Sequence, residues 1–448
     1  MSYCVVGGGI SGLVAALRLR RAVGPDATIT VFDPADRLGG ILRTERVGGQ
    51  TMDIGAEAFV VRRPEVPALL ADLGLAGRRI SPTGTRPLIY ADARLHPLPA
   101  GTVNGIPSAA ETMTDLVDAA TVAHMGAEPT RPLSWTAGAD PSAGDFVGDR
   151  FGAQVVARSV DPMLSGVYAG AAGGIGLRSA VPAVAAALDR GAPNLTEAVR
   201  AVLPPGPAGP VFGAVEGGYQ VVLDALIAQS GLRWQPTAVV ELQRDGGGWN
   251  VYDDEGACWP ADGVILALPA PRLATLTAGV APRTAAAARR IEVASSVVVA
   301  LAAPGGTPLP QNSGVLVATG ERLHAKAITL SSRKWGPRGN VELMRLSFGR
   351  CGDTIARDTS DDVLLDWSLE DLRTVFGIDV APVDVRMHRW LDAMPQYAPG
   401  HGGLVAELRA GLPPGLAVAG NFLDGIGVPA CAAAAGLAVE SLLGRVGR

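Results

Sequence analysis

Three glycines near the N-terminus, Gly7, Gly9 and Gly12, have the spacing of a turn that binds the pyrophosphate of a dinucleotide. In this pattern Gly7 permits a tight turn, Gly9 lets the pyrophosphate approach the backbone, and Gly12 allows close packing of the following helix. Asp33, about 20 residues further on, is placed to accept hydrogen bonds from ribose hydroxyls. The pattern therefore predicts a dinucleotide site, with a purely structural glycine turn as the alternative.

Two further glycine turns indicate which dinucleotide is bound. Arg37-Leu38-Gly39-Gly40 follows Asp33, and Gly425-Ile426-Gly427-Val428-Pro429 lies near the C-terminus. A nicotinamide site does not need these turns, whereas an extended cofactor such as FAD needs backbone contacts far along the chain. The alternative for the C-terminal turn is the end of a βαβ unit. The sequence has no second strand–GxGxxG–helix unit, which favours an oxidase or desaturase over a reductase.

The spacing of apolar residues predicts the strands and helices that hold these turns. A strand at Tyr3–Val6, a helix at Leu13–Ala22 and a strand at Thr28–Phe32 surround the first turn. Residues 107–200 are mostly helical in pattern. Strand patterns return from residue 233, with one strand expected at Trp234–Gln243, and a helix is expected at Asp361–Phe376. A strand at Leu416–Gly420 and a helix at Pro429–Leu443 repeat the strand-to-helix unit at the C-terminus.

This order predicts an α/β fold, α+β overall, whose Rossmann-type FAD-binding domain is assembled from discontinuous segments. A mixed-sheet substrate domain and a helical lobe are inserted into it. The expected FAD-binding segments are 1–85, 206–270 and 386–448, with the helical lobe at 86–205 and the sheet domain at 271–385.

Composition excludes several classes of protein. The 448 residues are 48% hydrophobic and 18% charged, which is typical of a globular chain, and a net charge of −5 gives no electrostatic basis for binding nucleic acid. Four separated cysteines and five histidines predict neither disulfides nor a metal site. No signal peptide or integral membrane segment is expected, so the predicted location is the cytoplasm, with peripheral contact to a membrane still open.

The assembled motifs resemble the protoporphyrinogen/coproporphyrinogen oxidase family of the FAD-dependent amine-oxidase superfamily. The three glycine turns are marks of the superfamily. More specific marks extend over almost the whole chain: Leu95–Pro99, Gly105–Pro107, Leu164–Gly170, Glu216–Tyr219, Arg333–Trp335, Arg389-Trp390 and Met394–Tyr397. The match is closest to the coproporphyrinogen III oxidases of Gram-positive bacteria.

The resemblance implies a set of FAD contacts and a substrate pocket beneath the flavin. Carried over by motif, the contacts are Gly7, Gly8, Gly9, Ile10, Ser11, Gly12, Asp33, Pro34, Arg37, Gly39, Gly40, Ile41, Gly55, Ala56, Glu57, Ala58, Val239, Trp390, Ile426, Gly427 and Val428. The implied substrate contacts are Tyr168, Lys326 and Ser347.

The implied reaction removes six electrons from a porphyrinogen in three steps, each passing a hydride from a methylene bridge to flavin N5. Oxygen then reoxidises the flavin and gives hydrogen peroxide. The expected substrate is coproporphyrinogen III, with protoporphyrinogen IX as the alternative, and the expected assembly is a monomer or a homodimer. Because the cofactor carries the electrons, the protein is expected mainly to position its ligands and exclude water.

Individual residues leave alternatives open. The Glu57 carboxylate orients the pyrrole N–H groups of the substrate or accepts a proton, or only the backbone of Glu57 touches FAD. Tyr168 lines the pocket or is a core aromatic, and Lys326 holds a propionate or has no role. The stretch Ala171–Gly174 lacks the acid or amide that the family usually has there, which puts the anchoring of this loop in doubt.

The competing functions are a flavin amine oxidase or carotenoid-type desaturase, and a flavin-binding protein without turnover. Amine oxidases often place a lysine against flavin N5 through a water. The chain has only two lysines, Lys326 and Lys334, and Lys326 is the one expected to serve.

Overall fold

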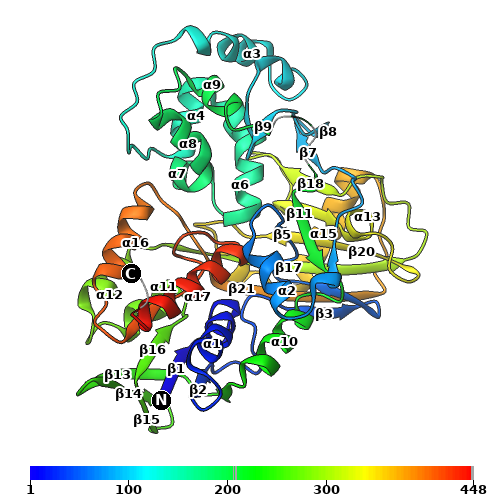
Figure 1. Ribbon diagram of the computed structural model, residues 1–448. Coiled ribbons are helices and arrows are strands. Elements are labelled where there is room, and N and C mark those ends of the chain that lie inside the picture. Colours follow the sequence, from blue (N-terminus) through cyan, green and yellow to red (C-terminus); the bar gives the residue numbers. More distant parts are fainter. Residues whose placement is uncertain (205, 207–208, 445–448) are drawn as a thin grey trace.

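The computed structural model describes residues 1–204, 206 and 209–444, which form three parts (Figure 1). We call them the parallel-sheet domain, the mixed-sheet lobe and the helical lobe, and the helical lobe lies at the top of the figure. Within the described residues, no helix is both long enough and apolar enough to cross a membrane.

The parallel-sheet domain is built on five parallel strands from three distant stretches of the chain. Their order is β12 (Arg233–Gln235), β2 (Thr28–Phe32), β1 (Ser2–Val6), β16 (Gly263–Leu266) and β22 (Leu416–Val418). Val5 of β1 pairs with Val31 on one side and with Ile265 on the other. The prediction of a Rossmann-type domain assembled from discontinuous segments is therefore confirmed.

Both faces of this sheet are covered, as its nearly continuous apolar strands require. One face packs against α1 (Ile10–Val23), α2 (Glu65–Asp72), α10 (Gln220–Ser230) and α17 (Val428–Leu442). The other face packs against α11 (Ala270–Leu276), α12 (Pro282–Arg289), α16 (His401–Ala410) and the antiparallel strands β13 (Val239–Asp245), β14 (Gly248–Asp253) and β15 (Cys258–Ala261).

One strand expectation needs correction. The continuous strand expected at residues 234–243 is divided into β12 in the parallel sheet and β13 in the antiparallel sheet. Pro236 lies between them, and because proline has no N–H to donate it interrupts the hydrogen-bonding ladder.

The mixed-sheet lobe contains seven strands. Their order is β21 (Asp384–Pro395), β17 (Val293–Pro304), β20 (Val341–Phe348), β19 (Ala327–Leu330), β18 (Gly314–Val317), β7 (Leu88–Ala91) and β8 (Arg94–Pro97). Its helices are α13 (Ser331–Trp335), α14 (Ile355–Asp358) and α15 (Asp361–Phe376). One face of the sheet packs against α15, and the other packs toward the hairpin of β3 (Thr44–Val47) and β4 (Gln50–Asp53).

The helical lobe extends from the end of β8 and has its own apolar core. Its elements are β9 (Thr102–Val103), β10 (Ile106–Pro107), α3 (Ala119–Gly126), α4 (Ala143–Phe151), α5 (Ala153–Val155), the π-helical turn η4 (Val156–Val160), α6 (Asp161–Tyr168), α7 (Leu177–Ala180), α8 (Pro182–Asp189) and α9 (Leu195–Arg200). The short 3-10 turns are η2 (Ala110–Met113), η3 (Glu128–Thr130) and η5 (Ala172–Gly174).

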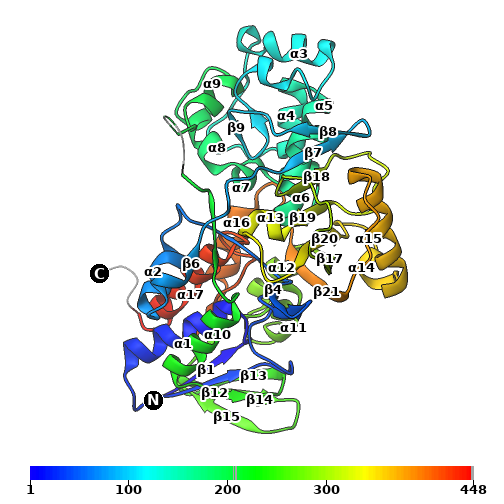
Figure 2. The ribbon, with the colours of Figure 1, turned by 90° about the vertical axis from the view of Figure 1, so that its right-hand side faces the viewer.

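The chain returns from the helical lobe to the parallel-sheet domain through β11 (Phe212–Val215), which pairs with β5 (Phe59–Val60) and β6 (Arg79–Ile80), the latter preceded by η1 (Ala76–Arg78) (Figure 2). The predicted segment boundaries stay a prediction. The one at residues 205 and 206 falls partly on Pro205, which lies outside the described residues, as do residues 445–448.

Candidate active site

The first glycine turn has the local geometry that its predicted role needs. Gly7 has φ +108°, and a Cβ there would lie 2.8 Å from the carbonyl carbon of Ala267. A Cβ on Gly12 would lie 3.1 Å from the carbonyl carbon of Gly7 and closer still to its oxygen. A Cβ on Gly9, in contrast, would find only the Gly40 Cα, at 3.8 Å. Two of the glycines are required by the packing of the protein itself, whereas Gly9 faces space that a phosphate could fill.

Asp33 lies at the end of β2 directly beside this turn. Its carboxylate accepts hydrogen bonds from the N–H of Gly8 at 2.6 Å and the N–H of Ala35 at 3.0 Å. Its own N–H donates to the Gln235 carbonyl at 3.1 Å, so the return segment that leads to Val239 lies next to Asp33. The structure therefore brings the predicted ribose acceptor and the turn together.

The second glycine turn packs on the first. The Gly39 N–H donates to the Gly8 carbonyl at 2.8 Å, and Gly9 and Gly39 form an isolated parallel bridge. The Arg37 guanidinium donates to the carbonyls of Gly40 at 2.7 Å and Leu42 at 2.8 Å. Arg37 thus braces the turn through its carbonyls, a role that the sequence did not indicate.

The third glycine turn starts α17, which packs along α1 in the apolar core. Neither the Gly9 cap of α1 nor the Gly427 cap of α17 supplies a side-chain hydrogen bond to its helix. Ser11 and Cys431, in the first turns of the two helices, are both buried, and the two helices pack closely along each other. Two helix N-termini with uncapped N–H groups form a fitting site for the pyrophosphate of a dinucleotide.

Residues 53–58 bring further predicted contacts to the same site. A Cβ on Gly55 would lie 3.2 Å from the Trp390 ring and would collide with the Ile41 carbonyl. The Trp390 indole N–H donates to the Ile54 carbonyl at 3.2 Å. Ile41 and Gly55 are 14 residues apart near the N-terminus and Trp390 lies near the C-terminal end of the chain, and the fold places all three in one cluster.

The Glu57 side chain is engaged by cations of the mixed-sheet lobe. Its carboxylate lies 3.1 Å from the Lys334 ammonium and 3.6 Å from the Arg345 guanidinium, and it accepts a hydrogen bond from the Trp335 indole. Burial raises the pKa of the Glu57 carboxyl, but these partners together lower it by more, so its pKa lies below the usual value. Glu57 is therefore ionised and already paired.

Sequence reasoning missed Lys334, Trp335 and Arg345 as neighbours of this site. The first two belong to the motif Arg333–Trp335, but nothing in that motif indicates that it reaches residue 57. Asp53 lies in the same cluster, and burial raises its pKa to about 6. The hydrogen bonds that its carboxylate accepts from Thr44 and Tyr219 lower the pKa, but by less.

The three predicted substrate residues lie where the helical lobe meets the mixed sheet. The Tyr168 hydroxyl donates to the Ser179 carbonyl at 3.2 Å, and burial raises the pKa of Tyr168 to about 12. Lys326 is 5% exposed, and its ammonium donates to the Gly349 carbonyl at 2.5 Å. Burial and, to a lesser extent, the charge of Arg350 lower the pKa of Lys326 to about 7.

Backbone hydrogen bonds connect these residues, one within the mixed sheet and one between the mixed-sheet lobe and the helical lobe. The Lys326 N–H donates to the Ser347 carbonyl at 2.8 Å, and the Cys351 N–H donates to the Ala169 carbonyl, one residue after Tyr168, at 2.6 Å. Of the two lysines, Lys334 lies against residues 53–58 and Lys326 is bound to Gly349.

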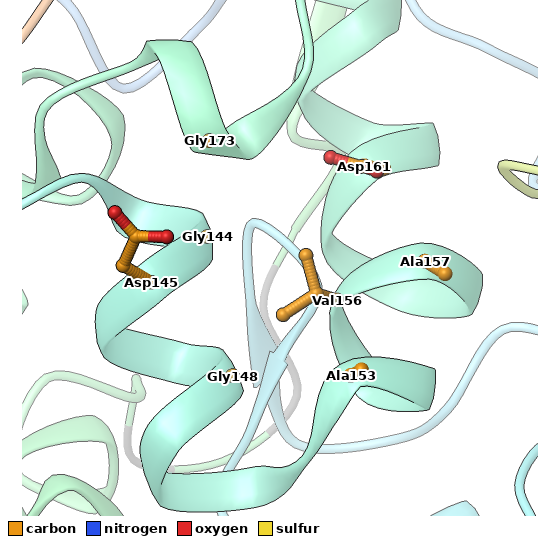
Figure 3. Close-up of a pocket in the computed structure, with 8 residues that line it drawn as sticks. All are labelled: Gly144, Asp145, Gly148, Ala153, Val156, Ala157, Asp161 and Gly173. Carbon is orange, nitrogen blue, oxygen red and sulfur yellow. The ribbon is translucent and has the colours of Figure 1, made fainter.

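The loop that departs from the family pattern is anchored from another element. The Asp161 carboxylate accepts the Ala172 N–H at 2.7 Å and the Thr319 hydroxyl at 2.8 Å. A cavity of about 410 Å³ opens beside this loop, between α4 and the turns leading into α6 (Figure 3). It is lined mostly by small residues, namely Gly144, Asp145, Gly148, Ala153, Val156, Ala157, Asp161 and Gly173, and by none of the predicted site residues.

Among the residues that the structure describes, no group of three or more His, Cys, Asp or Glu side chains could hold a metal ion.

Comparison with known proteins places the chain in a family. Residues 10–443 match the family of flavin containing amine oxidoreductases. A coproporphyrinogen III oxidase of Mycobacterium tuberculosis is 66% identical over 442 residues, which cover 99% of this chain and 97% of that protein. The Bacillus subtilis protein of the same name is 28% identical and covers 95% of this chain and 94% of its own.

A solved structure from Exiguobacterium sp. 255-15, assigned as a protoporphyrinogen oxidase, superposes with a TM-score of 0.88. It is 27% identical and covers 98% of each chain. The predicted FAD cofactor, the oxidoreductase class and the family are confirmed by these matches, and the predicted contact residues stay a prediction. The chain belongs to the flavin-containing amine oxidoreductase family, and it is an oxidoreductase with FAD as its cofactor.

Proposed function

We propose that this protein is a coproporphyrinogen III oxidase that takes electrons from its substrate and passes them to oxygen. The observation that carries this proposal is the 66% identity to the Mycobacterium tuberculosis protein of that name over almost the full length of both chains. The structure supports it, because all three glycine turns and both uncapped helix N-termini are in place for FAD. When bound, FAD accepts two electrons in each of the three oxidation steps.

The residues of the chain supply binding and orientation. We infer that the pyrophosphate lies at the N-termini of α1 and α17, the ribose next to Asp33, and the flavin ring against Ile41, Gly55–Ala58 and Trp390. Substrate binding is proposed at the junction of the helical and mixed-sheet lobes, near Tyr168, Lys326 and Ser347. A site between two lobes removes water from the reacting carbon, which strengthens electrostatic contacts there.

Glu57 acts in this proposal through its charge rather than as a base. Because its pKa is lowered and its oxygens are bound by Lys334, Arg345 and Trp335, the carboxylate is a weak base with few free lone pairs. We therefore propose that Glu57 joins the flavin segment to the mixed-sheet lobe, which favours its structural alternative over direct orientation of the pyrroles.

Protoporphyrinogen IX oxidation is the second candidate, and the similarity to the Exiguobacterium structure favours it. An amine oxidase is less well supported. Lys326 is bound to the Gly349 carbonyl, and the ammonium of Lys334 is bound to Glu57, so neither lysine is held free beside the flavin segment.

The test compares the possible substrates directly. The purified protein is checked for FAD by its absorbance, then supplied separately with coproporphyrinogen III, protoporphyrinogen IX and a panel of amines under air. Porphyrin fluorescence and hydrogen peroxide are followed together. We expect a faster rise of fluorescence with coproporphyrinogen III, with three peroxide molecules per porphyrin formed. Peroxide from an amine without porphyrin formation, or a preference for protoporphyrinogen IX, would refute the proposal.

A further inference from the structure

Arg345 of β20 points out of the mixed-sheet lobe toward the flavin segment. Side chains alternate along a strand, and Met344 and Leu346 lie in the core beneath α15, whereas Leu343 lies in the core on the opposite face. Arg345 shares the face of Leu343. The alternation therefore puts an arginine, rather than an apolar side chain, between the mixed sheet and residues 53–58.

The guanidinium contacts three alternate residues of this segment. It donates to the Asp53 carbonyl at 2.9 Å and to the Gly55 carbonyl at 3.0 Å, and it lies 3.6 Å from the Glu57 carboxylate. The carbonyls of Asp53 and Gly55 therefore both face the guanidinium. A planar guanidinium presents several donors in a fixed fork and can bind both carbonyls at once, whereas an ammonium is a compact point charge.

These contacts replace the bonds that a neighbouring strand would supply. β4 ends at Asp53, and residues 54–58 belong to no strand, although the Ile54 N–H still donates to the Arg43 carbonyl at 2.9 Å. Arg345 donates hydrogen bonds to the carbonyls of residues 53 and 55, and Trp390 donates one to the carbonyl of residue 54. The backbone before Ala56 is thus held by side chains of β20 and β21. The Arg345 side chain is only 11% exposed, which protects its hydrogen bonds from competition with water.

We propose that Arg345 is a positioning residue that fixes residues 55–58 in the conformation on which the flavin ring packs. This inference rests on the proposed flavin contacts of that segment. Without the guanidinium, two carbonyls lose their donors and Glu57 loses one of its two cations, so the segment is free to move away from the ring. FAD then binds more weakly and the ring is in a wetter, less uniform environment.

The test uses R345M and R345K, with R333M as the matched control. Arg333 is similarly buried at 18% exposure and also pairs with a carboxylate, that of Glu342, but its side-chain hydrogen bonds, to Glu342 and to the Leu309 carbonyl, stay within the mixed-sheet lobe. Apoprotein of each variant is titrated with FAD, and the absorption spectrum and midpoint potential of the bound flavin are recorded. We expect the dissociation constant for FAD to rise at least tenfold in R345M, and in R345K as well because an ammonium does not reach both carbonyls. Spectrum and potential should change in both.

R333M is expected to keep its FAD dissociation constant within twofold and its flavin spectrum unchanged. A wild-type dissociation constant, spectrum and potential in R345M would overturn the positioning role, and so would the same losses in R333M. If R345M does not fold, R345K decides the question by the same criteria. Failure of the proposed function is distinguishable, because it would be seen in the wild type as FAD that is bound without oxidation of coproporphyrinogen III.

Discussion

Replacing Gly9 with alanine separates the need of the cofactor from the need of the fold. Gly9 has φ −72° and ψ 178°, which any residue adopts, and the nearest atom to a new Cβ is 3.8 Å away. The matched substitution is Gly12→Ala, whose Cβ would lie 3.1 Å from the Gly7 carbonyl carbon and in collision with its oxygen. The two variants add the same methyl group at positions three residues apart.

The magnitudes follow from these contacts. For the apoprotein, Gly9→Ala loses roughly 0.5–1 kcal/mol because alanine is a poorer N-cap than glycine. It gains about 0.4–1 kcal/mol from the lower entropy of the unfolded chain, so the net change is near zero. Gly12→Ala overpacks the helix against the turn and is expected to destabilise the apoprotein by roughly 1–3 kcal/mol.

Gly9→Ala, which should barely change the stability of the apoprotein, is expected to weaken FAD binding strongly. In Gly9→Ala the methyl group occupies the space proposed for the pyrophosphate, and the loss of one or two charge-assisted hydrogen bonds at roughly 1.5–3 kcal/mol each is expected to raise the dissociation constant at least tenfold. Urea denaturation of the apoproteins and quenching of flavin fluorescence measure the two quantities. A Gly9→Ala protein with wild-type affinity for FAD would refute the placement of the pyrophosphate, and a large loss of its apoprotein stability would refute the reading of the turn.

Two buried groups give predictions on pH. The pKa of Asp53 is raised to about 6 in the folded protein, so its contribution to stability is present below its unfolded value of about 3.8 and is lost as pH rises through 6. The stability of Asp53→Asn relative to the wild type should therefore rise by about 1.4 kcal/mol between pH 5 and pH 8 in urea denaturation, which is roughly half of the ~3 kcal/mol expected over the full range from pH 3 to pH 8. A stability difference between variant and wild type that does not change with pH would contradict this. The pKa of Lys326 is lowered to about 7, so Lys326→Met should stabilise the apoprotein by roughly 2–4 kcal/mol near pH 6.5. This gain should shrink toward pH 10 in thermal melts, where the unfolded lysine also loses its proton. The same variant should raise the KM for coproporphyrinogen III if Lys326 binds a propionate, and an unchanged KM would remove it from the substrate site.

Much of the fold was predictable because its signals are local. The helix expected at Asp361–Phe376 is found with these bounds as α15, and the Ser360 hydroxyl caps it by accepting a hydrogen bond from the N–H of Val363. The division of one expected strand into β12 and β13 was missed, because the apolar alternation continues past Pro236 and the pattern alone does not say which sheet each half joins. The parallel-sheet domain could be inferred as discontinuous because its first and last strand–turn–helix units, at opposite ends of the chain, each carry a glycine signal.

The amino-acid sequence by itself determined the glycine turns and the helices they start, because a tight turn depends on the residue that occupies it. It also determined the family, through motifs that need no structure to be read. Only the tertiary structure decided that Glu57 meets Lys334, 277 residues away, and that Arg345 binds the carbonyls of Asp53 and Gly55. Such pairs depend on how the mixed sheet packs on the parallel-sheet domain, and no local pattern of charge or hydrophobicity encodes that packing.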